Sequence, residues 1–542
     1  MKWLGILLFS LFAATSVHAG IGQGLERIPI QDAGRIKPFG TFAGETLQLI
    51  YGKKTVNGKP AAEVVFTWVL IPEHWFKEPL IELRHKGLKE ALQITTDDRY
   101  YSAQSLFANP RIGLIFQELQ TLRGRGEKLN PYFQSVARLE SQLALFQAIR
   151  GGTALRFVPD PASDTWKSVA DLEGEPKQAF SRIIKAFAEA VDSKQEGASA
   201  KEQELNAAID DFIAKARAQA PEKYADSNRI QTELRFMHFH PFQWAWIAYL
   251  TGLVFLFFAV NFNWSGADWV SRLALWAGFG LHAYGMAVRV YLAGRPPVSN
   301  MYETVVWVPW GCVLFGLILE RVLQSRLVLV ASAAVAVFCL ILTDLAPTIL
   351  DASIQPLEPV LRSTFWLSTH VLIITISYAA FFLAFAVGDV LLYYFLKDEQ
   401  GYAHQIHVGV QAIYRALQIG VVLLAFGIIL GGIWADYSWG RFWGWDPKET
   451  WALIALLGYL ALLHGRLVGW VKNFQLAAGS VLAFSLVIMA WYGVNMVLGA
   501  GLHTYGFGAG GIEYVGGFLA LQIFFVTYVS ALRYYAPKNT TR

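Results

Sequence analysis

The distribution of apolar residues divides the 542-residue chain into two unlike parts. Residues 20–238 carry most of the charged side chains, whereas long apolar runs dominate from residue 239 onward. Nine of these runs have roughly the length of a membrane-spanning helix. They cover residues 242–260, 269–292, 303–320, 327–345, 366–396, 411–433, 450–468, 474–498 and 514–533. The pattern predicts an all-α polytopic membrane protein with a membrane domain over 239–542.

The part before the membrane domain is predicted to be mainly helical. Apolar residues recur there at three- and four-residue spacing, which is typical of amphipathic helices. The helices are expected at 111–123, 130–150, 175–194 and 202–220, with short strands at 81–83 and 155–158. We find no acid–base pair or metal cluster in the sequence of 20–238, so a scaffold or docking role is favoured for this domain.

The first nineteen residues have the features of a signal peptide. Lys2 precedes an apolar run, and Val17 and Ala19 supply the small residues of a cleavage site. The alternative is a retained anchor helix, and both interpretations place 20–238 outside the cytoplasmic membrane. With that start, the loops on the inner side hold more Lys and Arg than the outer loops, in agreement with the positive-inside rule. We therefore expect a multi-pass protein of a bacterial cytoplasmic membrane, with the loop at 434–451 outside.

Composition excludes several other classes of protein. Only 16% of the residues are charged, against about 25% in soluble domains. The net charge of +4 is too small to favour nucleic acid as a partner. Two cysteines exclude a disulfide framework within the chain, and no C-x-x-C-H segment is present to attach haem to this chain itself.

A tryptophan-rich loop lies between the sixth and seventh expected spans. Five of the nineteen tryptophans fall within residues 434–451, namely Trp434, Trp439, Trp443, Trp445 and Trp451. The run Asp446-Pro-Lys-Glu449 has the pattern of a helix start, with Asp as N-cap and Glu three residues later. An interfacial belt is the alternative, but a belt spreads its aromatic residues over many helix ends. The concentration therefore favours a site for a large planar apolar ligand.

Two histidines are expected on the same side of the membrane as this loop. His370 lies near the outer start of the fifth span, and His503 follows the eighth. A single histidine at a helix end is usually structural, but two neutral imidazoles can complete a six-coordinate haem iron. We predict His370 and His503 as axial ligands of a haem beside the tryptophan loop.

Four motifs then resemble one known family. Residues 439–451 resemble the WWD signature of haem-handling membrane proteins, and the Asp446–Trp451 ending resembles the CcsA (ResC) branch more than the CcmF or CcmC branches. Residues 366–370 and 501–506 are similar to the two external histidine motifs of that branch, with Thr504 where Ser is usual. Residues 295–303 resemble its outer-loop motif, and all four motifs occur in the family's order.

The resemblance implies a system II cytochrome c synthase. Such a haem lyase presents haem b outside the membrane and joins it to the two thiols of a C-x-x-C-H segment in apocytochrome c. On this basis we assign catalysis to Trp439, Trp443, Trp445 and Asp446. Haem binding is assigned to His370, His503, His464, Trp434 and Trp451. Arg295, Arg441 or Lys448 can pair with haem propionates or can simply be solvated.

Inside the membrane, His464 is the main candidate. It lies roughly 20 Å below the outer face of the seventh span, and an ionisable residue at such a depth is a functional hypothesis by default. The resemblance implies that His464 binds haem on its path from the cytoplasm. The second ligand is expected either from a separate CcsB (ResB)-like subunit, which we favour, or from His282 on the second span.

Two rival functions remain open at the level of sequence. One is a haem transporter or chaperone that delivers haem without ligation, and the other is an assembly factor that recruits a lyase. The expected partners are a CcsB/ResB-like membrane subunit, apocytochrome c, a thiol-reducing thioredoxin-like protein and the lipid bilayer, with no nucleic acid.

Overall fold

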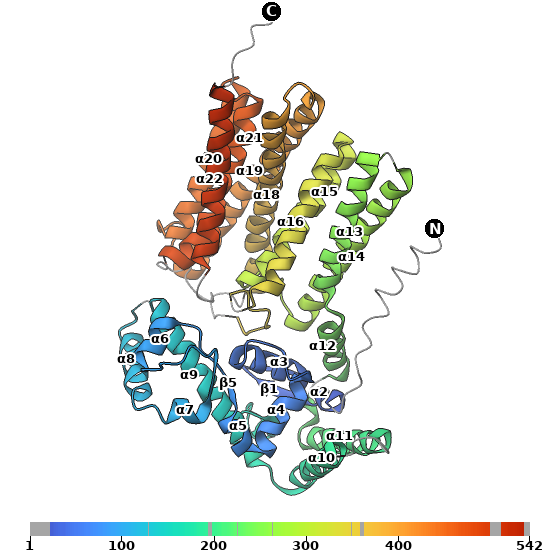
Figure 1. Cartoon of the computed structure of the whole chain (residues 1–542), viewed down its shortest axis with the longest axis vertical. Coiled ribbons are helices and arrows are strands. Elements are labelled where there is room, and N and C mark those ends of the chain that lie inside the picture. Colours follow the sequence, from blue (N-terminus) through green and yellow to red (C-terminus); the bar gives the residue numbers. More distant parts are fainter. Residues whose placement is uncertain are drawn as a thin grey trace, which may run out of the picture. The chain divides into compact units, whose positions relative to one another are not determined.

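The computed structural model describes residues 22–127, 129–192, 198–224, 226–262, 264–347, 349–357, 363–498 and 511–535. These residues are mostly helical, and the chain divides into two compact units, Met1–Met237 and His238–Arg542 (Figure 1). The expected signal peptide at 1–19 lies outside the described residues.

The first unit begins with a hairpin that the sequence pattern did not predict. Strands β1 (Pro29–Asp32) and β2 (Arg35–Pro38) pair antiparallel. Ala33 and Gly34 form the turn with φ of 47° and 74°, because a two-residue turn that matches the twist of both strands needs left-handed residues. Each strand has only four residues, so a period-two pattern does not stand out in the sequence.

The expected helices and strands of this unit are confirmed within a few residues. The helices are α8 (Ile112–Gly124), α9 (Pro131–Arg150), α10 (Gly174–Asp192) and α11 (Ala198–Gln219). The strands are β5 (Pro79–Glu82) and β7 (Arg156–Val158), paired with β6 (Tyr100–Ser102) and β8 (Lys167–Ser168). The side chain of Asn130 accepts the N–H of Phe133 and so caps α9.

Further short elements complete the unit around a core of aromatic side chains. Phe39, Phe66 and Phe157 are fully buried, and the Phe39 ring meets the other two edge-on. The remaining elements are α2 (Gln23–Glu26), α3 (Phe39–Ile50), β3 (Thr55–Val56), β4 (Lys59–Pro60), α4 (Ala61–Leu70), α5 (Pro72–Lys77), α6 (Lys86–Ala91), α7 (Ala103–Phe107), η1 (Val169–Asp171), η2 (Pro221–Lys223) and α12 (Ser227–Phe239).

Ion pairs connect the hairpin to the helices around it. Arg35 donates to both carboxylate oxygens of Glu233 on α12, at 2.7 and 2.9 Å. Buried Lys37 pairs with Asp32 at 2.8 Å and with Glu45. Burial lowers the pKa of the Lys37 amine, but the two carboxylates raise it, and the resulting pKa lies above its ordinary value. Lys37 therefore stays charged and paired at neutral pH.

The second unit is a bundle of long helices. Its elements are α13 (Pro241–Phe262), α14 (Ser265–Ala293), α15 (Met301–Leu323), α16 (Arg326–Leu345), α17 (Thr364–Trp366), η4 (Leu367–Val371), α18 (Leu372–Lys397), α19 (Ala403–Trp439), α20 (Pro447–Leu467), α21 (Asn473–Ile488), η5 (Met489–Leu498) and α22 (Ile512–Tyr535). Segments η4 and η5 are π-helical. The helix α18 packs against α15, α16, α19, α21 and α22.

Among the described residues, eight helical stretches are long and apolar enough to cross a membrane. They contain α13, α15, α16, α18, α19, α20, α21 and α22. Eight of the nine expected spans therefore have a matching helix of this kind. The other, 269–292, corresponds to α14, in which Arg272, His282 and Arg289 lower the mean hydropathy. A ninth crossing at α14 remains a prediction.

A line of glycines on α19 lets α18 approach closely. A Cβ atom at Gly420 would lie 2.5 Å from the Phe381 ring, and one at Gly427 would lie 2.4 Å from Ile374. A Cβ atom at Gly431 would lie 2.5 Å from His370. The three glycines are separated by seven and then four residues along α19. The residues that they meet are separated by the same intervals in the opposite direction along the chain. This is the register of two antiparallel helices in contact through one glycine face.

A similar close approach joins α18 to α21 and leads to the first prediction. A Cβ atom at Gly388 would lie 2.7 Å from Ser480 Oγ and 3.0 Å from the Ala477 carbonyl oxygen. Alanine in a helix gains about 1 kcal/mol over glycine, but overpacking costs about 1–3 kcal/mol. We expect Gly388→Ala to lower the thermal midpoint of the purified protein in detergent.

The matched control is Gly280→Ala on α14, where a Cβ atom meets nothing within 4 Å. This variant is expected to leave the midpoint unchanged or to raise it. Equal midpoints for both variants would show that the contact between α18 and α21 relaxes without cost.

Candidate functional site

The tryptophan loop is a short connection between two helix ends, each of which has its own cap. Helix α19 ends at Gly440, whose φ of 68° is left-handed and whose N–H bonds to the Asp436 carbonyl. Helix α20 begins with Asp446 as N-cap, and Asp446 and Glu449 form a complete capping box. The helix start expected from Asp446 to Glu449 is therefore confirmed.

The carboxylate of Glu449 holds the backbone just before this helix. Its Oε2 atom accepts the N–H of Gly444 at 2.8 Å and the N–H of Asp446 at 3.1 Å. Between these two donors lies Trp445, which has a φ of 55° and a side chain that is 70% exposed. A left-handed conformation costs a non-glycine residue about 1–2 kcal/mol, so the surrounding contacts must stabilise it. No local sequence pattern predicts this conformation.

A pocket of about 1090 Å³, counting the part open to solvent, lies beside the loop. It is lined by four segments that are far apart in the sequence. Residues of the predicted motifs and of the tryptophan loop that line it are Val298, Ser299, Asn300, His370, Trp434, Phe442, Trp443, Lys448 and Glu449. The other lining residues are Thr304, Val371, Ile374, Thr375, Tyr378, Ile428, Gly431, Gly432, Ala452 and Trp491. Its lining is rich in aromatic and aliphatic side chains, which suits a large, mainly apolar ligand.

His370 enters this pocket from the π-helical segment η4, and its ring is fixed by a hydrogen bond. The Nδ1 atom lies 2.8 Å from the Gly427 carbonyl oxygen on α19. Because a carbonyl only accepts, Nδ1 must carry the proton, and the ring lone pair is then on Nε2. Metal-binding histidines are commonly oriented by such a bond. The centroids of the His370 and Trp434 rings are 5.7 Å apart and the ring planes form an angle of 65°, which is an edge-on contact.

The structure separates the five tryptophans of the loop. Trp434, 9% exposed, and Trp443 line the pocket with His370. Trp445 meets Trp443 edge-on at 5.9 Å and 88° but is not among the lining residues. Trp439 and Trp451 are not among the lining residues either. Three further aromatic residues of the pocket, Tyr378, Phe442 and Trp491, were not among the site residues predicted from the sequence.

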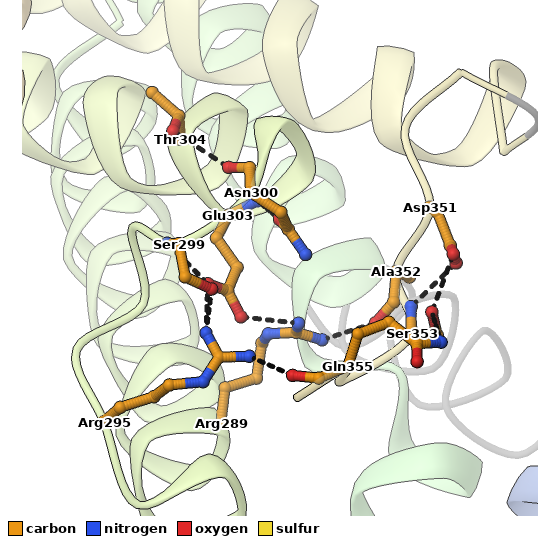
Figure 2. Close-up of polar contacts among 10 residues, drawn as sticks. All are labelled: Arg289, Arg295, Ser299, Asn300, Glu303, Thr304, Asp351, Ala352, Ser353 and Gln355. Carbon is orange, nitrogen blue, oxygen red and sulfur yellow. Dashed lines mark hydrogen bonds and ion pairs between the residues drawn. The ribbon is translucent and has the colours of Figure 1, made fainter. Parts of the chain in front are cut away.

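A buried polar network forms the neighbouring wall and connects residues 295–303 to the 351–355 loop. Figure 2 shows Arg289 and Arg295 converging on the carboxylate of Glu303, with N–O distances of 2.9 and 3.5 Å. Arg289 also donates to the Ala352 carbonyl at 2.8 Å, and Arg295 donates to the Gln355 carbonyl at 2.7 Å.

The Glu303 carboxylate also orders the chain that reaches the pocket. It accepts from Ser299 N at 2.9 Å and from Ser299 Oγ at 2.7 Å. Asn300 caps α15 through the N–H of Glu303 at 2.8 Å. Arg295 is only 7% exposed and is bonded within this network, so its role in the described structure is to shape the wall.

Of the two other candidate cations, only Lys448 lines the pocket. Its Nζ atom lies 3.3 Å from Oδ1 of Asn495 on the π-helical segment η5. The guanidinium of Arg441 lies instead against Gly444 in the loop.

The candidate intramembrane histidines differ in their surroundings. His464 is exposed on α20, and its Nδ1 lies 2.8 Å from the Leu460 carbonyl, so Nε2 holds the lone pair, as in His370. His282 is completely buried in α14. Its Nε2 lies 2.9 Å from the Val306 carbonyl, and its Nδ1 lies 3.5 Å from the Tyr249 hydroxyl. Figure 1 shows α14 and α20 at opposite sides of the bundle. His503 lies outside the described residues.

The part of the chain that lines this pocket has relatives among known proteins. A sequence profile described as Cytochrome C assembly protein matches residues 298–503, the part of the chain that lines it. Protein NrfI of Wolinella succinogenes is 32% identical over 510 residues, which cover 90% of this chain and 54% of NrfI. The chain thus spans about half the length of that relative.

Shorter relatives match the membrane part. The cytochrome c biogenesis protein CcsA of Synechococcus sp. (strain CC9902) is 34% identical over 254 residues, which cover 41% of this chain and 81% of CcsA. CcsA of Synechococcus sp. (strain WH7803) is 33% identical over 299 residues, which cover 47% of this chain and 91% of CcsA. The chain therefore belongs to the family of cytochrome c biogenesis proteins that includes CcsA.

Proposed function

We propose that the protein is a cytochrome c haem lyase that presents haem b at the outer face of the membrane and attaches it to apocytochrome c. The observation that carries this proposal is the pocket, which brings His370, Trp434 and Trp443 together with residues 298–304. One oriented imidazole, a set of aromatic walls and a nearby lysine suit a planar apolar substrate that carries iron and carboxylates.

The proposed reaction needs positioning more than acid–base chemistry. The S–H bond of each cysteine in a C-x-x-C-H segment adds across one haem vinyl group. Sulfur bonds to one vinyl carbon and hydrogen to the other, so the step needs no oxidant or reductant. Both cysteines must arrive as thiols, which is why a thioredoxin-like reductant is a proposed partner. The chain's task is to hold the substrate plane against the incoming thiols.

Each site residue has a distinct part in this proposal. His370, oriented by the Gly427 carbonyl, binds the iron through Nε2, and His503 is the proposed second axial ligand. Trp434 and Trp443 hold the porphyrin plane, and Trp439, Trp445 and Trp451 support the loop around it. Asp446 caps α20 and so fixes the loop's end. Lys448 is the proposed partner of a propionate.

Haem is proposed to reach this site through the membrane by way of His464. In its most apolar stretch, only 17% of α20 is buried, compared with 61% for the stretch that contains α18, so α20 has more surface left for lipid or another subunit. An exposed histidine on such a helix suits an interface with a CcsB/ResB-like subunit that supplies the second ligand. The enclosure of His282 favours this separate subunit over an internal pair. The proposed setting is the bacterial cytoplasmic membrane, with residues 1–19 as signal peptide and 20–238 outside.

Co-expression tests the proposed activity directly. The chain is produced with an apocytochrome c, with and without a CcsB-like subunit, in a host that lacks its own maturation system. Covalent haem on the cytochrome in a denaturing gel is the expected result. Haem in the purified chain without covalent product would instead indicate a transporter or chaperone, and a colourless chain would indicate an assembly factor.

Removing the proposed outer ligand should abolish the product. His370→Ala is expected to reduce covalent haem to background while the chain remains abundant, and added imidazole should partly restore it by replacing the ligand. His404→Ala removes an exposed histidine at the other end of α19 and serves as the matched control. Full yield from His370→Ala would exclude this histidine from the reaction.

The orientation of His370 can be changed without altering the residue. A Cβ atom at Gly431 would lie 2.5 Å from Cε1 and 3.0 Å from Nδ1 of His370, so Gly431→Ala must displace the ring. Loss of an orienting hydrogen bond typically lowers metal affinity or activity about 10–100-fold. We expect a fall of that size in covalent haem, with a shifted haem absorbance maximum. Gly280→Ala should retain the normal yield and spectrum, and a Gly431→Ala protein that matches it would rule out this dependence.

The haem path is tested with the two intramembrane histidines. His464→Ala is expected to lower both the haem that purifies with the chain and the yield of holocytochrome. His282→Gln keeps a hydrogen-bonding side chain in the buried site and should leave haem per folded chain unchanged. Loss of haem in His282→Gln at normal protein stability would instead assign the second ligand to this chain.

A further inference from the structure

The strongest unexplained feature of the loop is the second hydrogen bond of Glu449. A capping box requires only that the glutamate accept the N–H of the N-cap residue, which here is Asp446. The same Oε2 atom also accepts the N–H of Gly444 at 2.8 Å, two residues before the cap. The two bonds therefore enclose Trp445.

The two hydrogen bonds on either side of Trp445 restrain its backbone conformation. With φ at 55°, Trp445 is one of six left-handed residues other than glycine among the described residues, and it is the largest of them. A bulky residue persists in that region only where neighbouring contacts hold it. One acceptor that binds the N–H groups on both sides of the residue provides such a restraint.

The restraint also sets where the two neighbouring indoles lie. Trp443 lines the pocket, whereas the Trp445 side chain is 70% exposed and meets Trp443 edge-on. If Trp445 returned to a right-handed conformation, the chain direction between the two residues would change. The edge-on pair and the placement of Trp443 in the pocket would then be lost.

We propose that Glu449 is a positioning residue, which holds Trp445 left-handed and thereby keeps the Trp443 indole against the substrate plane. Its effect on haem attachment rests on the proposed function. Its effect on the loop does not, so the two can be tested separately.

Hydrogen exchange tests the restraint itself. Glu449→Ala removes the acceptor, whereas Glu449→Gln keeps one side-chain oxygen that can accept both N–H groups. In peptides that cover 440–448, Glu449→Ala should show faster exchange at two amides, those of Gly444 and Asp446, and Glu449→Gln should resemble the unaltered protein. Unchanged protection in Glu449→Ala would overturn the proposal.

Covalent haem yield tests the consequence. Misplacement of a positioning group can lower a rate about a hundredfold, so we expect Glu449→Ala to reduce holocytochrome per chain at least roughly tenfold. Glu449→Gln should retain most of the yield. Lost protection together with a normal yield would also overturn the proposal, because the restraint would then have no role in the reaction.

Two further variants separate this role from charge and from general stability. Glu449→Asp keeps the charge, but its chain is one methylene shorter and cannot reach both donors, so it should behave like Glu449→Ala. This variant also keeps the test decisive if Glu449→Ala fails to fold. Glu513→Ala removes a glutamate from the first turn of α22 and should leave both readouts unchanged. If the unaltered protein yields no holocytochrome, the proposed function fails while hydrogen exchange still decides the restraint.

Discussion

The contact between α18 and the glycine face of α19 is the constraint on which the site depends. Gly420, Gly427 and Gly431 have no side chains, so the backbones of the two helices can approach closely. His370 lies against Gly431, the last of these glycines. The carbonyl of Gly427 can accept from the imidazole only because no side chain stands between the helices. The same packing that stabilises the membrane unit therefore selects the ring nitrogen that keeps its lone pair.

Hydropathy and capping signals in the sequence were sufficient to predict eight helices long and apolar enough to cross a membrane, and the start of α20. Both signals depend on local residue order, so bounds such as Pro447–Leu467 could be anticipated from 450–468. The π-helical segment η4 could not, because it lies against α19, a contact between distant parts of the chain. The left-handed Trp445 could not either, because the second hydrogen bond of Glu449 is not part of the capping pattern. Trp491 was missed for a related reason. Trp491 lies within an apolar run, so by sequence it is simply part of a span. Only the packing of the helices brings its side chain to the pocket.

The motif at 295–303 shows that the surroundings of a residue cannot be predicted from its motif alone. By sequence, Arg295 is a loop cation that a carboxylate substrate could bind. In the structure it is buried and shares Glu303 with Arg289 (Figure 2). Breaking a buried pair by removing one partner typically costs about 3–5 kcal/mol, so each of these charges depends on the others. The motif then acts through the wall that it builds, from which Ser299 and Asn300 reach the pocket.

For the three candidate histidines among the described residues, the sequence does not predict which ring nitrogen is free to bind a metal. Motif and depth gave reasons to consider each of them, but a ligand role also depends on which nitrogen keeps its lone pair and what that nitrogen faces. In His370 and His464 a carbonyl binds Nδ1, which leaves the lone pair on Nε2 at the far side of the ring. In His282 a carbonyl binds Nε2, and Nδ1 lies within a fully buried site beside the Tyr249 hydroxyl. The same residue type thus occurs in two arrangements, which differ in the ring nitrogen that a carbonyl oxygen contacts.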